Sequence, residues 1–411
     1  MTSWITSLLL VGALAASAAA GAQPASPSSK ASARSSPHDS LVVGASVSLT
    51  GAHADLAADY GRGLEHWAQE TNAAGGILGR PVELRILDDG SSARRAGEAY
   101  RQLIEAQADA LIGPYGSAAT LLAAAEAEAA QRVLVNGAGW SREIHRRNPR
   151  FVFQTAVPYG AYGNVMKLAQ AAGITRAFLL HRDDPASREM AAAAQAAAPE
   201  AGVSAGEAQA YPASTIDFTP YVQSARASGA QAWIAFGSVA DAAQMIKTFK
   251  RLKYAPAFFF ASGSADRRLL RLVGQDAERS LGAVRYHPGA PTSGNDRFVR
   301  SFEARWGTAP TPAAAEGYAA GTVLAEALRR AGTTDPASLA ATLSTMRTET
   351  VLGEYRVDPA SGAQLATEPL VTQVLRAQFP IAWPPALRKE SSVLPYPLLS
   401  YPEWAEREYF E

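Results

Sequence analysis

The chain has 411 residues, and its 38 Lys and Arg balance its 38 Asp and Glu, so the formal net charge at pH 7 is zero. This balance, with no basic block along the sequence, argues against a polyanion bound through counterion release, and we expect no nucleic-acid partner. The lack of cysteine excludes disulfides, thiolate metal sites and a lipid-bearing cysteine. The length exceeds that of one typical core, so two domains are expected.

The N-terminus has the features of an export signal. An apolar run from Ile5 to Ala20 leads to Ala20-Gly21-Ala22, which fits a signal-peptidase site. The run is short and mostly alanine, so a retained membrane anchor is the weaker interpretation. We predict a signal peptide over residues 1–22, cleaved near Ala22, and a periplasmic protein. Residues 23–40, rich in Ser, Ala and Pro, predict a disordered linker.

From Leu41 onward, short apolar runs alternate with longer stretches of helical period. Strands are predicted at residues 41–49, 82–88, 110–113 and 133–136. Between the first two, Tyr60, Leu64 and Trp67 recur at the spacing of one helix face. Strands separated by helices in this way are typical of βαβ units, with a parallel sheet covered on both faces.

A second series with the same rhythm begins near Phe151. Its strands are predicted at residues 177–181, 203–208, 232–236 and 257–262. The chain then becomes helical over 296–306 and 313–331, and it ends in strand-like pieces at 353–357 and 370–375. We predict an α/β protein with two Rossmann-like lobes.

Recognisable catalytic motifs are missing. The stretch GPYGSAAT, residues 113–120, runs from a strand through a glycine turn to a helix start. It lacks the lysine of a P-loop and the second glycine of a nucleophile elbow. The six histidines are scattered, without a metal-binding pair. We therefore expect no enzyme, no metal and no cofactor, and we keep a secreted α/β enzyme as an alternative.

One block carries a specific family resemblance. The segment NAAGGILGRPVEL, residues 72–84, resembles the helix-to-strand block of type I periplasmic substrate-binding proteins of the branched-chain amino-acid ABC transporter class. The similarity continues through ALIGPYGSAAT, RVLVNGAGWS, FVFQTAVP and EGYAAGTVLAEAL. It implies two lobes with parallel-type sheets, joined by three crossovers near residues 156–159, 283–287 and 365–368. Such lobes close on a ligand in the cleft between them.

The resemblance also implies how the chain is divided. The first lobe would comprise residues 41–156 plus 286–366, and the second would comprise 157–285 plus 367–390. Residues 391–411 form a tail whose role is not predicted. The implied partner is an inner-membrane ABC permease, and we expect a monomer. A sensor that presents its closed form to a membrane receptor or kinase stays open as an alternative.

The resemblance places the carboxylate of a ligand against two loops of the first lobe. Ser117 would donate its hydroxyl, with the amide of Thr120 nearby, and Ala138, Gly139 and Trp140 would line the second loop. A serine hydroxyl and free amides at a helix N-terminus suit a carboxylate. The alternative is that Ser117 only caps its helix.

The rest of the implied pocket departs from the family pattern. Leu56, Ala186 and either Val239 or Ala240 stand where aromatic residues are implied. Ser262 stands where the resemblance implies an acidic partner for a ligand ammonium.

An unpartnered ammonium is costly to bury, so these departures bear on the ligand. Either Asp183, Asp184 or Asp241 pairs with the ammonium, or the ligand has none. We hypothesise an organic acid, aromatic or apolar, with a neutral amino acid or an amide as the second candidate.

Trp140 replaces a small residue of the implied second loop. It either stacks on a planar ligand, together with Tyr115 and Tyr159, or packs under its own loop. The sequence leaves both interpretations open.

Overall fold

The structure, a computed structural model, describes residues 40–387. The predicted signal peptide, the predicted linker up to residue 39 and the tail at 391–411 lie outside the described residues. Within residues 40–387, no helix combines the length and the apolar character needed to cross a membrane.

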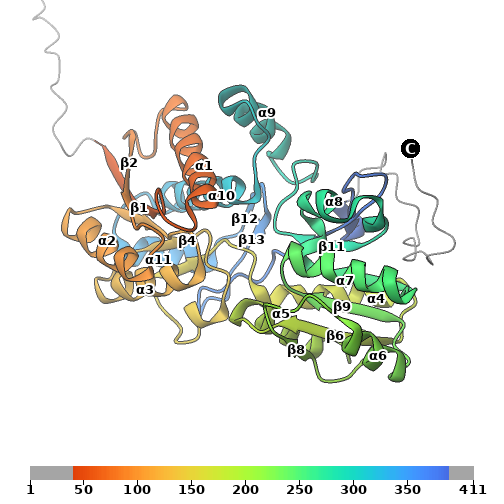
Figure 1. The fold of residues 1–411 in the computed structure, drawn as a ribbon. Helices are drawn as coiled ribbons and strands as arrows, with labels where there is room; N and C mark the ends of the chain where they lie inside the picture. Colours follow the sequence, from red (N-terminus) through yellow and green to blue (C-terminus); the bar gives the residue numbers. More distant parts are fainter. Residues whose placement is uncertain (1–39, 388–411) are drawn as a thin grey trace, which may run out of the picture. The chain divides into compact units, whose positions relative to one another are not determined.

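The first lobe is built on a five-stranded parallel sheet, with strand order β2-β1-β3-β4-β5. Figure 1 labels β1, β2 and β4 of this sheet. Its strands are β1 (Leu41–Val47), β2 (Val82–Asp88), β3 (Ala110–Ile112), β4 (Leu134–Asn136) and β5 (Val152–Gln154). Its helices are α1 (Ala54–Ala73), α2 (Ala93–Glu105), α3 (Ser117–Ala129), α9 (Asn295–Trp306), α10 (Pro312–Ala331) and α11 (Pro336–Thr345). A hairpin of β12 (Thr348–Thr350) and β13 (Gly353–Tyr355) follows them.

Both faces of the first sheet are covered, as the apolar runs predict. Val43 and Ala45 of β1 pack in one core with α1 and α10, whereas Val42 packs in another core with α2 and α3. Helices α1 and α10 pack against each other (Figure 1).

The block at residues 72–84 has a clear structural reason. Helix α1 ends at Ala73, and Gly75 and Gly76 follow with positive φ angles of 96° and 80°. A Cβ on Gly76 would lie 2.1 Å from the carbonyl oxygen of Arg80. The Asn72 side chain then donates to the Val82 carbonyl at 2.9 Å and accepts from the Val82 amide at 2.6 Å. Asn72 thereby fixes the point at which β2 begins.

The second lobe contains the larger sheet, with strand order β15-β14-β11-β10-β9-β6-β7 and β8 also paired with β6. Its strands are β6 (Arg176–Arg182), β7 (Ser204–Ala205), β8 (Gln209–Tyr211), β9 (Ala232–Phe236), β10 (Phe258–Ala261), β11 (Leu281–Val284), β14 (Leu370–Gln373) and β15 (Ile381–Trp383). Its helices are α4 (Asn164–Ala171), α5 (Pro185–Ala197), α6 (Thr219–Ala227), α7 (Val239–Leu252) and α8 (Arg268–Val273). Short 3-10 turns, η1 (Arg142–Ile144), η2 (Tyr159–Gly163), η3 (Ser262–Ala265), η4 (Gly274–Ala277) and η5 (Pro385–Leu387), complete the elements.

The second sheet is also covered on both faces. Leu179 and Ile234 pack with α4 and α5, whereas Phe178 and Trp233 pack with α6 and α7. The expectation of parallel-type sheets holds for β6 to β11, but β14 runs antiparallel to β11, and β15 runs antiparallel to β14. These two strands join at the edge of the sheet after the chain has returned from the first lobe.

The chain passes between the lobes three times within residues 40–387: after β5, after β11 and between β13 and β14. The predicted two-lobed α/β fold with three crossovers is therefore confirmed. The residue boundaries assigned to the lobes remain a prediction. Helices α4, α8 and α11 had no specific counterpart in the sequence analysis, because their apolar faces are short.

Candidate functional site

Two loops at the carboxyl edge of the first sheet lie side by side. The β3–α3 loop reaches Gly116 with a φ of 101°, a conformation that favours glycine, and α3 begins at the next residue. Tyr115 forms a parallel bridge with Ala138 of the loop after β4, and the Gly116 amide donates to the Ala138 carbonyl at 2.9 Å. These contacts bring together the two loops that the resemblance assigned to a ligand carboxylate.

Ser117 ties the two loops together through its side chain. Its Oγ accepts hydrogen bonds from the amides of Trp140 and Ser141 at 3.0 and 3.2 Å. Gly116, not Ser117, occupies the cap position of α3. Ser117 therefore does not act as a plain helix cap, and its hydroxyl hydrogen can still donate to a ligand.

The N-terminus of α3 offers donors. The amides of Ser117, Ala118 and Ala119 form no hydrogen bond with any other residue in the range 40–387. Unpaired amides at a helix start attract anions.

Thr120 is placed differently from the expectation. Its amide donates to the Gly116 carbonyl at 3.0 Å, so this amide is already engaged within the turn. Its buried hydroxyl lies 3.2 and 2.9 Å from the carbonyls of Pro114 and Gly116. A Cβ on Gly139 would lie 2.7 Å from the Thr120 Cβ, so Thr120 also sets how closely the second loop packs.

A row of aromatic side chains runs along this edge. The ring of Trp140 lies 5.3 Å from Tyr115, edge to face, and 6.0 Å from Tyr159. Tyr60 extends the row at one end, 6.0 Å from Tyr115, and Tyr162 extends it at the other, 6.4 Å from Tyr159. The structure thus brings Trp140, Tyr115 and Tyr159 together, as the sequence analysis expected, while their contact with a ligand remains a prediction.

Sequence reasoning missed a buried ion pair beside this row. Oε1 of Glu316, in α10, accepts from Arg285 Nε at 2.7 Å and from Trp140 Nε1 at 2.8 Å. The Arg285 guanidinium lies over the Trp140 ring, 4.2 Å from its centroid. Glu316 is fully buried, and its Oε2 has no hydrogen-bond partner among residues 40–387. The sequence did contain a signal for this pair: Glu316 is a lone acidic residue on the otherwise apolar face of residues 313–320.

Within the cluster, Arg285 keeps its charge and Glu316 is the carboxylate paired with it. Burial raises the pKa of the Glu316 carboxyl, and the nearby Arg285 acts in the opposite direction. Burial also raises the pKa of Tyr115 to about 12, again opposed by Arg285. An arginine stays protonated in such surroundings, and Tyr115 stays neutral at physiological pH. The cluster can therefore present a guanidinium and neutral hydroxyl donors to an anion.

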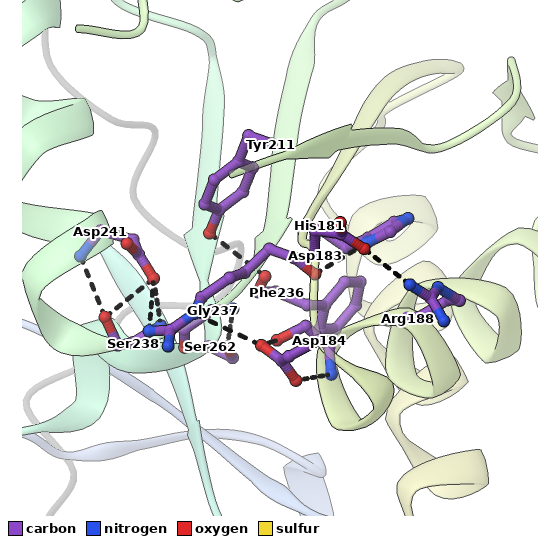
Figure 2. A network of polar contacts seen from close by, with 12 residues as sticks. His181, Asp183, Asp184, Arg188, Tyr211, Phe236, Gly237, Ser238, Asp241 and Ser262 are labelled. Atoms are coloured by element: carbon purple, nitrogen blue, oxygen red, sulfur yellow. Dashed lines mark hydrogen bonds and ion pairs between the residues drawn. The ribbon is translucent and has the colours of Figure 1, made fainter. Parts of the chain in front are cut away.

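The carboxyl edge of the second sheet holds the other predicted residues (Figure 2). Asp241 completes a capping box with Ser238 at the start of α7: its Oδ2 accepts from the Ser238 amide at 2.7 Å and the Ser238 hydroxyl at 2.8 Å. Asp184 caps α5 and accepts from the amide and the hydroxyl of Ser187, both at 2.9 Å. Two of the three predicted ammonium partners thus hold helix starts.

The remaining predicted residues of this edge form hydrogen bonds or ion pairs within the protein as well. Ser262 accepts from the Gly237 amide and donates to the Gly237 carbonyl, both at 3.0 Å, which joins the ends of β9 and β10. Asp183 is exposed and pairs with Arg188 at 2.6 Å. Their roles toward a ligand remain predictions.

Three positions where aromatic residues were implied lie in the first turns of helices. Ala186 belongs to α5 and Val239 to α7, and Val239 packs against the core of the second lobe. Leu56, in α1, is 55% exposed. None of the three contributes a ring, so the aromatic surface of the site comes from the row that contains Trp140.

One side chain of the second lobe reaches the loops of the first. Oε2 of Glu189, in α5, accepts from the Ser141 hydroxyl at 2.8 Å, and its Oε1 accepts from the Arg142 amide at 2.8 Å. Because the Ser141 amide in turn donates to Ser117, one chain of hydrogen bonds connects the two loops with α5. A cavity of about 500 Å³, lined in part by Glu189 and Arg142, adjoins this contact.

Comparison with known sequences decides the family. A sequence profile of the periplasmic binding protein family matches residues 40–377. The chain belongs to the periplasmic binding protein family. This periplasmic binding protein is 26% identical, over 336 residues, to the amino acid binding protein of Pseudomonas aeruginosa, covering 77% of this chain and 86% of that protein.

Solved structures agree in fold. The ABC transporter substrate-binding protein from Sphaerobacter thermophilus superposes with a TM-score of 0.72 at 24% identity, covering 83% of this chain and 96% of that one. The solute binding protein of an ABC transporter from Rhodopseudomonas palustris BisB5, in complex with 3,4-dihydroxy benzoic acid, superposes with a TM-score of 0.68 at 21% identity, covering 83% and 95%. These two likenesses show that this periplasmic binding protein shares its fold with proteins of that description.

No group of three or more metal-ligating side chains gathers anywhere in residues 40–387. The polar side chains of the two edges are instead arranged as hydrogen-bond donors, ion pairs and helix caps.

Proposed function

We propose that this periplasmic binding protein closes its two lobes around a small carboxylate-bearing ligand, an organic or aromatic acid or an amino acid, and delivers it to an inner-membrane ABC permease. In this proposal the protein acts as a monomer, with lobes bounded as in the sequence analysis. The observation that carries it is the group of donors at the first edge: the unpaired amides of α3, the Ser117 hydroxyl and, beside them, Arg285.

The donors are sufficient in number and kind. A hydrogen bond to a charged group contributes roughly 1.5–3 kcal/mol, and a micromolar complex requires about −8 kcal/mol. Two or three such bonds from α3 and Ser117 would supply much of that affinity. A guanidinium nearby also suits a carboxylate better than it suits a ligand ammonium.

The acid is expected to carry an aromatic or apolar body. Trp140, Tyr115 and Tyr159 lie next to the donors, and aromatic rings stack favourably at such distances. Two relatives illustrate the range: one is described as an amino acid binding protein, and another was solved with 3,4-dihydroxy benzoic acid. An amino-acid cargo would need an acceptor for its ammonium, and the carboxylates at the second edge already hold helix starts or an arginine.

A thermal-shift screen of the exported chain tests the proposed ligand class. The panel would contain aliphatic and aromatic carboxylates, neutral amino acids and the matching amides. We expect carboxylates to raise the melting temperature and their amides to fail, since an amide brings no charge to the donors. Stabilisation by compounds without any carboxylate, and by no others, would refute the proposal.

Delivery to a permease needs its own measurement. The liganded protein should stimulate the ATPase activity of the permease complex reconstituted in vesicles, and the free protein should do so weakly. If the liganded form instead activates only a membrane receptor or kinase, the transport role is wrong and sensing is the function.

A further inference from the structure

Among the charged residues of the second edge, Arg182 has the N–H donors that form the fewest hydrogen bonds. It is the last residue of β6, and its side chain is 35% exposed. Its nearest carboxylate oxygens are distant for hydrogen bonds: Nε lies 3.5 Å from Asp184 Oδ2, and Nη1 lies 3.8 Å from Asp241 Oδ2. Nε is buried and has no hydrogen-bond partner among residues 40–387.

The neighbouring carboxylates, in contrast, use their acceptors elsewhere. Both oxygens of Asp184 accept from Ser187 at 2.9 Å, and Oδ2 of Asp241 accepts two bonds from Ser238. A guanidinium carries five N–H donors and no acceptor. The Nε–H of Arg182 is thus a buried donor that neither carboxylate satisfies, and a ligand group rich in acceptors can pair with it.

Arg182 also stands on the side of the lobe that meets the first lobe. Ligands of open parallel α/β sheets bind outside the carboxyl ends of the strands, and Arg182 ends β6 at such an edge. Helix α5 follows directly after β6, and its Glu189 contacts Ser141 and Arg142 of the first lobe. The β6–α5 side of the second edge thus faces the loops that carry Ser117 and Trp140.

We propose that Arg182 binds a second acidic group of the ligand, so that the cargo is a dicarboxylate held at one end by the first edge and at the other by Arg182. This inference rests on the proposed function and makes its ligand class more specific. With Asp184 and Asp241 beside Arg182, the empty site has two carboxylates for one guanidinium, so the second acidic group is bound by the N–H donors of Arg182 and not by net charge. Both carboxylates also hold the guanidinium close to the edge of the sheet.

Isothermal titration calorimetry on the exported chain tests this assignment. The ligands are linear dicarboxylates of increasing length, and terephthalate, each paired with a monocarboxylate of the same size, such as 4-methylbenzoate for terephthalate. The variants are Arg182→Gln and, as a matched control, Arg188→Gln, because Arg188 lies on the same β6–α5 segment but its Nη2 is already bonded to Asp183 at 2.6 Å. Melting temperatures report whether each variant is folded.

We expect at least one dicarboxylate to bind about tenfold or more tightly than its monocarboxylate partner, the range for one charge-assisted contact. Arg182→Gln should remove this advantage and leave monocarboxylate affinity unchanged, whereas Arg188→Gln should retain it. Monocarboxylates that bind as tightly as dicarboxylates, or an advantage that survives Arg182→Gln, would overturn this inference alone. A protein that binds no carboxylate of either kind would overturn the proposed function and this inference together.

Discussion

At both carboxyl edges of this protein a helix begins just after a strand, but the two edges treat the first amides of those helices differently. At the first edge, α3 begins with a glycine in the cap position, so its leading amides are left without acceptors. At the second edge, α5 and α7 begin with the side chains of Asp184 and Ser238, which occupy those amides. The first edge therefore presents backbone donors, and the second presents side chains. In the proposed function, the backbone donors of the first edge would set the ligand class, and the side chains of the second edge would set the individual ligand.

The largest effect, on the free energy of unfolding, is expected for Glu316, the buried carboxylate beside the first edge. Glu316→Ala would leave Arg285, only 22% exposed, without its partner, and breaking such a pair costs about 3 kcal/mol or more. Urea denaturation of the variant should show this loss of unfolding free energy. Glu316→Gln keeps the side-chain volume and one hydrogen-bond acceptor, so it should lose clearly less unfolding free energy than Glu316→Ala. Equal stability of Glu316→Ala and the natural protein would contradict the role assigned to this pair.

Ser117→Ala should separate binding from stability. The amides of Trp140 and Ser141 lose their acceptor, which costs about 1–3 kcal/mol in unfolding free energy, and the ligand loses a donor, which weakens binding about tenfold. Thr311→Ala removes the cap of α10 and should cost about 1 kcal/mol without changing the Kd. Calorimetric titration with the best carboxylate of the screen compares the Kd of the Ser117→Ala variant with that of the Thr311→Ala variant. Ser117 is no ligand donor if both variants bind alike.

Glu189→Gln tests the contact that joins the two edges. Losing the charge of an acceptor that bonds Ser141 and Arg142 should weaken ligand binding by about threefold to tenfold, if this contact between the lobes is one that ligand binding favours. X-ray scattering with saturating ligand should still show a compact form. Glu200→Gln, beside the same cavity, serves as control and should bind normally. A larger loss in the control than in Glu189→Gln would argue against the assigned contact.

The smallest predicted effect is the pH dependence of stability that His145 causes. Burial lowers the pKa of His145, whose Nδ1 lies 2.8 Å from the Ser361 carbonyl and whose Nε2 has no partner among residues 40–387. Below the unfolded pKa of about 6.5, the unfolded chain takes up a proton that the folded chain resists, so stability falls as pH falls.

His145→Phe should flatten this dependence. Its melting temperature should change less between pH 7 and pH 5 than that of the natural protein, even though it loses one hydrogen bond and is somewhat less stable at pH 7. His66 titrates in both proteins and cancels in the difference. Parallel curves for the two proteins would show that His145 does not contribute.

The sequence predicts most of the fold because its signals are local. Asn72, Gly75 and Gly76 act within one turn, and the apolar alternation of β1 follows from the faces it covers. The pairing of β14 and β15 could not be predicted in direction, since an edge strand that returns from another lobe carries no local mark of its orientation.

The site was predictable only where the family resemblance supplied it. Ser117 and Trp140 were proposed in this way and stay predictions as ligand contacts, whereas the contact of Arg285 with Glu316, which joins positions 31 residues apart on a crossover and on α10, was missed. Side-chain pairing at such a distance depends on how helices pack over the sheet, and no periodicity encodes it. The uses of Asp184 and Asp241 as caps were readable in principle, because an acidic or hydroxyl residue stands immediately before or within the first turn of each helix.

The contact of Glu189 with Ser141 also bears on the rate at which a ligand would be released. A binding protein that hands over its cargo must part its lobes, and here parting them means breaking bonds on the very loop that Ser117 organises. In the proposed function, the lifetime of this short hydrogen-bonded chain would then limit how fast the ligand is released.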